Sequence, residues 1–284
     1  MDTLSVLRKR PGLFFRLSGI RIEDFDKLAE ETRPRWERGE HERLSRPNRK
    51  RGIGAGRRYA LDFSSQLLLC LIYYRTYTTH VFMGLVFGVS SPTACRVING
   101  ISELLAAHFR MPERKVRLTP EEQDELLYLM VDGTERPIYR PQKPGKRKKK
   151  YSGKKKRHTA VHQIVTDNNK RILAVGPAQE GRRHDKAIYD ETRLEKPPDM
   201  MTLGDLGYLG TSFEIPIKKP KNKEISKADK KYNRWFSGLR AGVEHAIGRM
   251  KKFRIFSETH RNNRLQNIIA KNVAALANIN LKIA

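Results

Sequence analysis

Cysteine is scarce in this sequence, because its 284 residues contain only Cys70 and Cys95. Two cysteines are too few for a disulfide framework or for a zinc site built on thiolates. Both lie in apolar stretches of helical pattern, where a cysteine behaves as a small buried residue. We therefore expect no structural disulfide and a protein that works in a reducing compartment.

Long apolar runs and acidic residues are scarce as well. No stretch approaches the roughly 20 apolar residues that span a bilayer, and the first residues lack a signal-peptide pattern. We therefore expect a soluble intracellular protein with no membrane partner.

The chain has only 31 acidic residues and 58 Lys and Arg, which gives a formal net charge of +27. Because each base that neutralises a phosphate releases a counterion, this excess favours nucleic acid as the partner.

Apolar residues make up 38% of the chain, which is enough for a core and argues against disorder throughout. The first 60 residues are nevertheless basic and irregular. Within them, 22–44 has the pattern of a charged helix that we expect to break before Pro34. The stretch from Arg46 to Arg58 holds Gly and Arg and no acid. It is either a solvated linker or an arm that binds a nucleic-acid backbone.

Residues 61–111 have the outline of a helix-turn-helix domain. Asp62 can cap a helix over 63–74, and a second short helix spans 79–87. Gly88 follows, where a left-handed residue would close the second helix, and Ser91 and Pro92 begin a third helix that runs to about residue 109. An ordinary helical hairpin is the alternative. In a DNA-binding unit, the third helix would present to base edges or phosphates the side chains of Thr93, Arg96 and Asn99.

After a proline-bounded segment at 112–120, the pattern changes to strands alternating with helices. The strands are predicted at 126–131, 159–167, 171–175, 200–203 and 215–218, and the helices at 184–194, 235–254 and 265–283. Asn168 and Asn169 supply the turn of a hairpin between the second and third strands. This order predicts an α/β domain with a mixed five-stranded sheet and flanking helices. We place its boundaries at 120–256, with 257–284 as a C-terminal helix that packs on it.

Two of the predicted strands end in an aspartate that is closely followed by glycine. They give Asp132 with Gly133, and Asp205 with Gly207. If these strands lie parallel and adjacent, both carboxylates emerge at the same edge of the sheet. The glycines would leave room there for a backbone or a phosphate to approach.

A third acid, Glu244, lies in the predicted helix over 235–254. Arg240, Glu244 and Lys251 are spaced i, i+4 and i+11, so they share one helical face. Three converging carboxylates repel one another and require a cation, and their hard oxygens select Mg²⁺ or Mn²⁺. Two such ions would hold the attacking and leaving oxygens of a phosphoryl displacement. Arg240 and Lys251 would then hold DNA phosphates.

Several short motifs surround these residues. They are Asp-Gly-Thr at 132–134, Arg-Pro-Ile at 136–138, Arg-Pro at 140–141, Tyr-Ser-Gly-Lys-Lys at 151–155 with His158 beyond, Gly-x-x-His-Asp at 181–185, Asp-x-Gly-Tyr at 205–208 and Arg-x₃-Glu-x₆-Lys at 240–251. With them, the chain resembles the DDE transposases of bacterial insertion sequences that are related to the PIF/Harbinger transposases. The resemblance covers about residues 60–256. Ser237 departs from it, because some related transposases carry a tyrosine there.

The resemblance implies a ribonuclease-H-like catalytic domain, preceded by an all-α helix-turn-helix domain. It implies that Asp132, Asp205 and Glu244 are the catalytic residues and the ligands of two Mg²⁺ or Mn²⁺ ions. The implied substrates are double-stranded DNA at the ends of a mobile element and target DNA. We expect a homodimer or higher multimer on DNA, in the cytoplasm of a bacterial or archaeal host.

Asp185 is a competitor for the second acidic position. It lies just inside a predicted helix start, where an acid interacts well with the helix dipole, so a capping role is the simpler interpretation. We interpret the neighbouring His184 as a structural or DNA-side residue, because a histidine ligand is unusual among hard oxygen donors.

The stretch from Arg140 to Arg157 contains eleven Lys or Arg and no acid. A run of this kind is usually a solvated loop. Because it follows directly on Asp132, we expect a loop that projects from the active-site side and tracks the DNA backbone. The expected contacts are Lys146, Lys148, Lys149, Lys150 and Lys154.

Two other functions stay open. One is a catalytically silent DNA-binding protein derived from a transposase, although such relics tend to lose acids and all three are intact here. The other is a ribonuclease-H-like nuclease that cleaves DNA without joining it.

Overall fold

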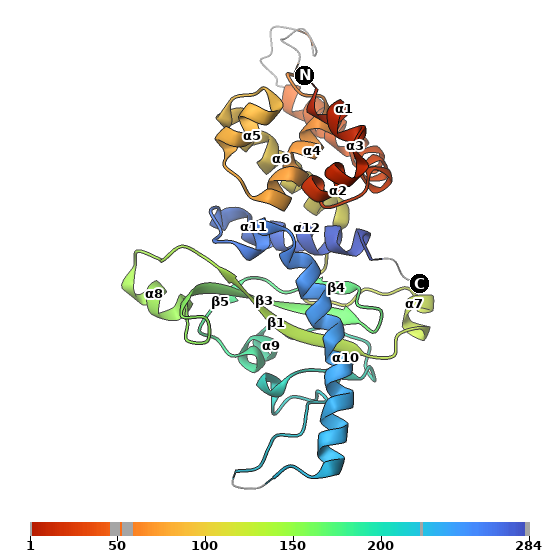
Figure 1. The fold of residues 1–284 in the computed structure, drawn as a ribbon, viewed down its shortest axis with the longest axis vertical. Helices are drawn as coiled ribbons and strands as arrows, with labels where there is room; N and C mark the ends of the chain where they lie inside the picture. Colours follow the sequence, from red (N-terminus) through yellow and green to blue (C-terminus); the bar gives the residue numbers. More distant parts are fainter. Residues whose placement is uncertain (1, 46–51, 53–58, 222–223, 282–284) are drawn as a thin grey trace. The chain divides into compact units, whose positions relative to one another are not determined.

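The structure is a computed structural model that describes residues 2–45, 52, 59–221 and 224–281. It divides into two compact units (Figure 1). The first comprises Met1–Arg110 with Lys252–Ile255, and the second comprises Met111–Lys251 with Phe256–Ala284. The stretch Arg46–Arg58, predicted to be a linker or a DNA-binding arm, lies outside the described residues except for Gly52.

The first unit is helical. Its elements are α1 (Thr3–Arg8), α2 (Pro11–Ser18), α3 (Ile22–Leu44), α4 (Phe63–Thr76), α5 (His80–Phe87) and α6 (Ser91–Phe109). Helix α4 is buried along most of its length, because α2, α3 and α6 all pack against it. This explains why its sequence is apolar around the whole helix.

The three helices predicted within 61–111 are confirmed, and their ends follow from local chemistry. The Asp62 carboxylate accepts from the backbone N–H of Ser65 at the start of α4, and Thr79 caps α5 in the same way. Gly88 closes α5 with φ of +66°, and Ser90 caps α6. Helices α5 and α6 are bent by 98° at the turn between them. This is the geometry of a helix-turn-helix.

The break expected before Pro34 is wrong, because α3 continues through that residue. A proline removes one backbone hydrogen bond from a helix but does not prevent it when packing holds both sides. Phe25 and Leu28 are buried before Pro34. Beyond it, the ring of Trp36 lies 5.2 Å from that of Phe63. Tertiary packing on both sides of the proline therefore keeps α3 continuous.

No helix that the structure describes is by itself long and apolar enough to cross a membrane. Only α5 and α6 taken together reach that length and composition, and they are the bent helix-turn-helix pair.

The second unit is built on a mixed sheet. Its strands are β1 (Leu129–Pro137), β2 (Tyr151–Ser152), β3 (Arg157–Asp167), β4 (Ile172–Val175), β5 (Gln179–Glu180) and β6 (Thr202–Leu203). The order is β2-β3-β1-β6, and β4 and β5 also pair with β3. β1 runs antiparallel to β3 and parallel to β6. The expected mixed sheet of a ribonuclease-H-like domain, with its two aspartate-bearing strands parallel, is confirmed, but among the described residues it has six strands instead of five.

Helices cover both faces of this sheet. The helices after the first unit are α7 (Pro120–Asp124), α8 (Pro144–Lys150), α9 (Asp185–Thr192), η1 (Leu206–Tyr208), α10 (Lys227–Lys251), α11 (Arg254–Ser257), η2 (Asn263–Leu265) and α12 (Gln266–Ile279), and α11 spans a boundary between the two units. Figure 1 shows α10 crossing β1 and β3, and α12 packs on β4 and α10. On the other face, Val131, Val165 and Leu173 form a core with Tyr208 and Phe213.

Three sequence-based boundaries are corrected. The first strand begins at Leu129 instead of residue 126 and continues through Asp132, because all nine of its residues pair with β3. The strand predicted at 215–218 does not form in these described residues. The preceding residue, Glu214, forms only an isolated bridge with Leu203. The basic stretch predicted as a loop contains α8 and β2.

Candidate active site

Strand pairing brings Asp132 and Asp205 together. Because β1 and β6 run parallel, with Met130 opposite Leu203, the backbone carries both aspartates to the same edge. The Asp132 carboxylate accepts from the N–H of Gly133 at 2.8 Å. Asp205 caps η1, and its carboxylate accepts from the N–H of Gly207 at 2.8 Å. Each acid is thus fixed by the glycine that follows it.

The electrostatics of Asp132 reflect a crowded acidic site. Burial raises the pKa of its carboxyl to about 6, the Arg240 guanidinium opposes that shift, and the charges of Asp205 and Asp185 add to it. These four side chains therefore act on one another across a short range. A buried acid among like charges costs stability unless a cation neutralises it.

Asp185, the competitor for the second acidic position, lies at this site. A Cβ atom on Gly133 would lie 2.1 Å from its Oδ1, and one on Gly207 would lie 3.2 Å from its Oδ2. Burial raises the pKa of Asp185, and the nearby Asp205 raises it further. The room left by the two glycines is therefore filled by the Asp185 carboxylate in this structure.

Helix α10 brings the third predicted acid. Glu244 is 60% exposed, and its carboxylate lies 3.4 Å from Nη2 of Arg240. Burial lowers the pKa of Lys251, with Lys155 lowering it further and Asp132 and Glu135 opposing the shift. Arg240 and Lys251, which flank Glu244 on one helical face, therefore both lie near Asp132.

Within the described part of the chain, no three Asp, Glu, His or Cys side chains are gathered closely enough to hold an ion as a group. The donor chemistry does fit a hard divalent cation, because Asp132 is a buried carboxyl that Asp205 and Asp185 destabilise in its ionised form. Asp132 and Asp205 would hold such an ion, and Glu244 would have to approach them.

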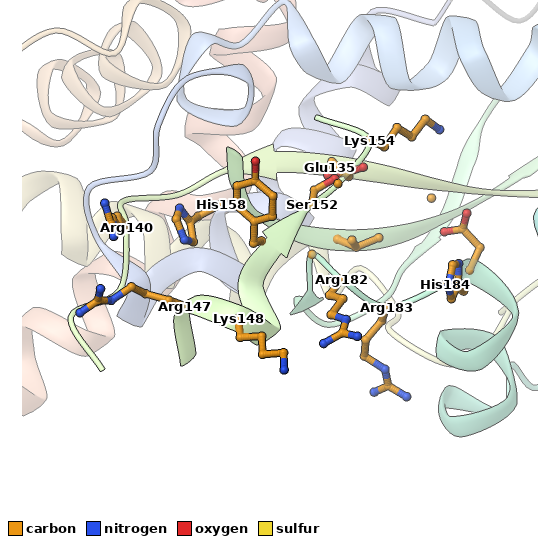
Figure 2. Close-up of a pocket in the computed structure, with 16 residues that line it drawn as sticks. Glu135, Arg140, Arg147, Lys148, Ser152, Lys154, His158, Arg182, Arg183 and His184 are labelled. Carbon is orange, nitrogen blue, oxygen red and sulfur yellow. The ribbon is translucent and has the colours of Figure 1, made fainter. Parts of the chain in front are cut away.

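A basic cavity of about 910 Å³ adjoins these acids (Figure 2). Gly133, Glu135 and Asp185 lie at its acidic side. Arg147 and Lys148 of α8 line it, together with Arg182 and Arg183 of the segment between β5 and α9, and Figure 2 labels all four. Of the five lysines expected to contact DNA in this region, Lys148 and Lys154 line the cavity, while Lys146, Lys149 and Lys150 do not.

The residues predicted to read DNA lie on α6. Arg96 is exposed, while Thr93 and Asn99 are half-buried. Thr93 Oγ1 lies 2.9 Å from Ser90 Oγ, and Nδ2 of Asn99 lies 3.8 Å from Cys95 Sγ. Thr93 and Arg96 also line a separate cavity of about 810 Å³ within the first unit. Arg96 is therefore the most available of the three.

Sequence reasoning missed Glu135, Arg182 and Arg183. Glu135 lies on β1 and accepts a hydrogen bond from Thr159 Oγ1 at 2.7 Å. The only local signal was its position three residues after Asp132, on the opposite face of the strand. Arg182 and Arg183 occupy the two variable positions of the Gly-x-x-His-Asp motif. The motif therefore indicated that this segment is functional, but it did not predict that the two arginines line a cavity.

Comparison with known proteins assigns the class. The profile of the DDE superfamily endonuclease family matches residues 131–279. The profile named helix-turn-helix of DDE superfamily endonuclease matches residues 59–110. The chain belongs to the DDE superfamily endonuclease family. This family generally uses divalent metals, and its helix-turn-helix implies DNA binding.

Two curated relatives are transposases by name. The probable transposase for insertion sequence element IS702 of Microchaete diplosiphon is 31% identical over 270 residues, which cover 92% of this chain and 91% of the relative. The putative transposase for insertion sequence element IS112 of Streptomyces albus G is 29% identical over 209 residues, which cover 72% of this chain and 75% of the relative. No solved structure matches the chain.

Proposed function

We propose that this chain is the transposase of an insertion sequence, which binds the ends of its element, cleaves them and joins them to target DNA. The observation that carries the proposal is the parallel β1–β6 pair, which holds Asp132 beside Asp205 in a chain of the DDE superfamily endonuclease family. The names of the two relatives support the same activity.

In this proposal, Asp132, Asp205 and Glu244 are the catalytic triad. When bound, two Mg²⁺ or Mn²⁺ ions would supply Lewis-acid activation of water or of a DNA 3′-OH. Arg240 holds Glu244 on the face of α10 that lies near Asp132. Arg240 and Lys251 would bind the phosphates that flank the scissile bond.

Binding and catalysis are assigned to different surfaces. Thr93, Arg96 and Asn99 of α6 would select the element ends. The lysines of α8, with Lys154, would contact phosphates and add affinity without sequence preference. Because an element has two ends, we propose a homodimer or higher multimer on DNA, acting in the host cytoplasm.

The first prediction tests the triad. Asp132→Ala, Asp205→Ala and Glu244→Ala should each abolish strand cleavage and largely preserve DNA binding, since the three acids belong to the α/β unit and not to the helix-turn-helix unit that contains α6. Cleavage is measured on a plasmid that carries the coding sequence with its native flanking DNA, in Mg²⁺ and in EDTA. EDTA should stop the wild type.

Glu258→Ala is a matched control, because this acid follows α10 in the chain and lies outside the proposed triad. It should cleave as the wild type does. If a triad variant cleaves at a near wild-type rate in Mg²⁺, that residue is not catalytic. If all variants and the wild type bind DNA but none cleaves it, the silent DNA-binding alternative holds.

A further inference from the structure

The basic cavity is held open by backbone contacts. A Cβ atom on Gly181 would lie 2.1 Å from Thr159 Oγ1 and 3.0 Å from the Lys150 carbonyl oxygen. The segment between β5 and α9 therefore packs directly on β3 and on the end of α8. The N–H of Arg182 donates to the Lys149 carbonyl at 3.1 Å, which fixes the two walls to each other. These backbone contacts therefore fix the shape of the cavity on this side.

Only some of the cationic side chains of the cavity have partners within the protein. The Arg183 guanidinium pairs with Glu191, and that of Arg147 donates to the Gln142 carbonyl. Across the described residues, Arg140, Lys148 and Arg182 have no acidic partner. These three cations lie on different segments around one concave surface. Cations so placed fit the phosphates of a nucleic-acid strand that turns into the cavity.

The cavity also has an aromatic wall. Tyr151 is 42% exposed, so part of its ring is free to contact a ligand. It pairs with His158 across β2 and β3, and the two rings meet edge to face with centroids 5.5 Å apart. An aromatic ring that a neighbouring ring holds in place, beside cations that bind phosphate, is the combination on which a nucleobase stacks.

The size of the cavity selects what can enter it. Pockets of about 300 to 1,000 Å³ hold molecules of drug or nucleotide size, and this one has about 910 Å³. A sphere of this volume is only about 12 Å across, which is the width of one major groove, so an intact double helix is too large to enter. An unpaired nucleotide can enter when its base leaves the stack. The acidic side of the cavity, with Gly133 and Asp185, joins it to the aspartates of the candidate active site.

We propose that this cavity binds one unpaired deoxynucleotide of the DNA end, with its base against Tyr151 and its phosphates on Arg140, Lys148 and Arg182. This inference rests on the proposed function, since it requires DNA at the active site. It adds that the enzyme engages a strand end that is locally unpaired. Phosphate binding alone would not need the Tyr151 ring, so this side chain distinguishes a nucleotide site from a general basic surface.

The experiment measures fluorescence anisotropy with the full chain in EDTA and two labelled probes. One is a blunt 20-base-pair duplex, and the other is the same duplex with a three-nucleotide dT overhang. The wild type should bind the overhang probe more tightly by about 5- to 100-fold, the range that stacking of one base supplies. Tyr151→Ala should lose this preference while its affinity for the blunt duplex is kept, and Tyr151→Phe should retain it.

Tyr139→Ala is the matched control. Tyr139 is 63% exposed and lies close to Arg140 in the chain, but it does not line the cavity, so the preference should be unchanged. Equal binding of both probes by the wild type would overturn the inference, as would a full preference in Tyr151→Ala. Both results would leave DNA binding, and with it the proposed function, intact. If the wild type bound neither probe, the proposed function would fail as well.

Discussion

At the scale of single residues, the close approach of Gly133 and Asp185 is the tightest constraint at the candidate site. Oδ1 of Asp185 occupies the place where a side chain on residue 133 would begin. Gly133 also donates its N–H to the Asp132 carboxylate. One glycine therefore sets the positions of two acids, on opposite faces of β1.

The second prediction follows from this contact. Gly133→Ala should destabilise the fold by roughly 1–3 kcal/mol, because the added methyl group displaces Asp185 or the strand, and it should strongly reduce cleavage. Gly248→Ala is the control: this glycine lies in α10 with nothing within 4 Å of an added Cβ, so alanine should stabilise by up to about 1 kcal/mol.

Chemical denaturation of the wild type, Gly133→Ala, Asp185→Ala and the double variant identifies the cause. If Asp185 is the obstacle, adding Gly133→Ala to Asp185→Ala should cost much less than adding it to the wild type. An equal cost in both backgrounds would mean that the methyl group meets something other than Asp185.

The third prediction concerns His162, a buried residue on the face of β3 that α10 and α12 cover. Its Nδ1 donates to the Gly176 carbonyl at 2.9 Å, and burial lowers the pKa of its ring from 6.5 to about 4. Between these values the unfolded chain binds a proton that the folded chain does not. Stability should therefore fall as pH drops from about 6.5 to 4.

His162→Gln keeps a donor for Gly176 but cannot titrate. Between pH 7 and 4.5 it should lose roughly 2 kcal/mol less stability than the wild type does. His245→Gln, at an exposed position on α10, should follow the wild-type curve. The free energy of unfolding is measured in urea at each pH, and parallel curves for His162→Gln and the wild type would show that this histidine does not contribute.

At the scale of elements, local patterns predicted the helices of residues 61–111 well and the strands less well. Asp62, Thr79 and Gly88 act on the backbone within a few residues, so the ends of α4 and α5 could be predicted from them. The shared face of Arg240, Glu244 and Lys251 is likewise a property of one helix. β1 was placed wrongly because its polar half, from Asp132 onward, is a strand only through pairing with β3.

The candidate site was predictable only in part for the same reason. The aspartate followed by glycine at two strand ends indicated Asp132 and Asp205, and the parallel pairing they required is present. The contact between Asp185 and Gly133 depends on how α9 packs on the sheet, which no local pattern encodes. The cavity formed by α8, β2 and the segment before α9 could not be predicted either, because it also depends on how these segments pack against one another.

The fourth prediction belongs to α6. Arg96→Ala and Asn99→Ala should each reduce the discrimination between element-end DNA and random DNA by roughly 1–3 kcal/mol, because these residues would face base edges. Affinities are measured on both DNAs at one salt concentration. Equal losses on the two DNAs would indicate phosphate contacts alone, and α6 would then not be the reading helix.

At the scale of the whole molecule, the proposed DNA recognition and the proposed catalysis belong to two different units. The helical unit carries the helix-turn-helix, and the α/β unit carries the aspartates and the basic cavity. The net charge of +27 serves both, because binding and positioning DNA each require phosphates to be neutralised. Joining DNA, as opposed to cutting it, is the step that separates a transposase from a nuclease of similar fold.

Strand transfer is therefore the most direct test of the central claim. The substrate is a labelled duplex taken from the DNA that flanks the coding sequence, ending in a free 3′-OH, and the target is a supercoiled plasmid. With Mg²⁺, the wild type should join label to plasmid, whereas Asp205→Asn should give no joined product and still bind the end. Bound DNA that is only hydrolysed, or that stays unchanged with the wild-type protein, would contradict the account.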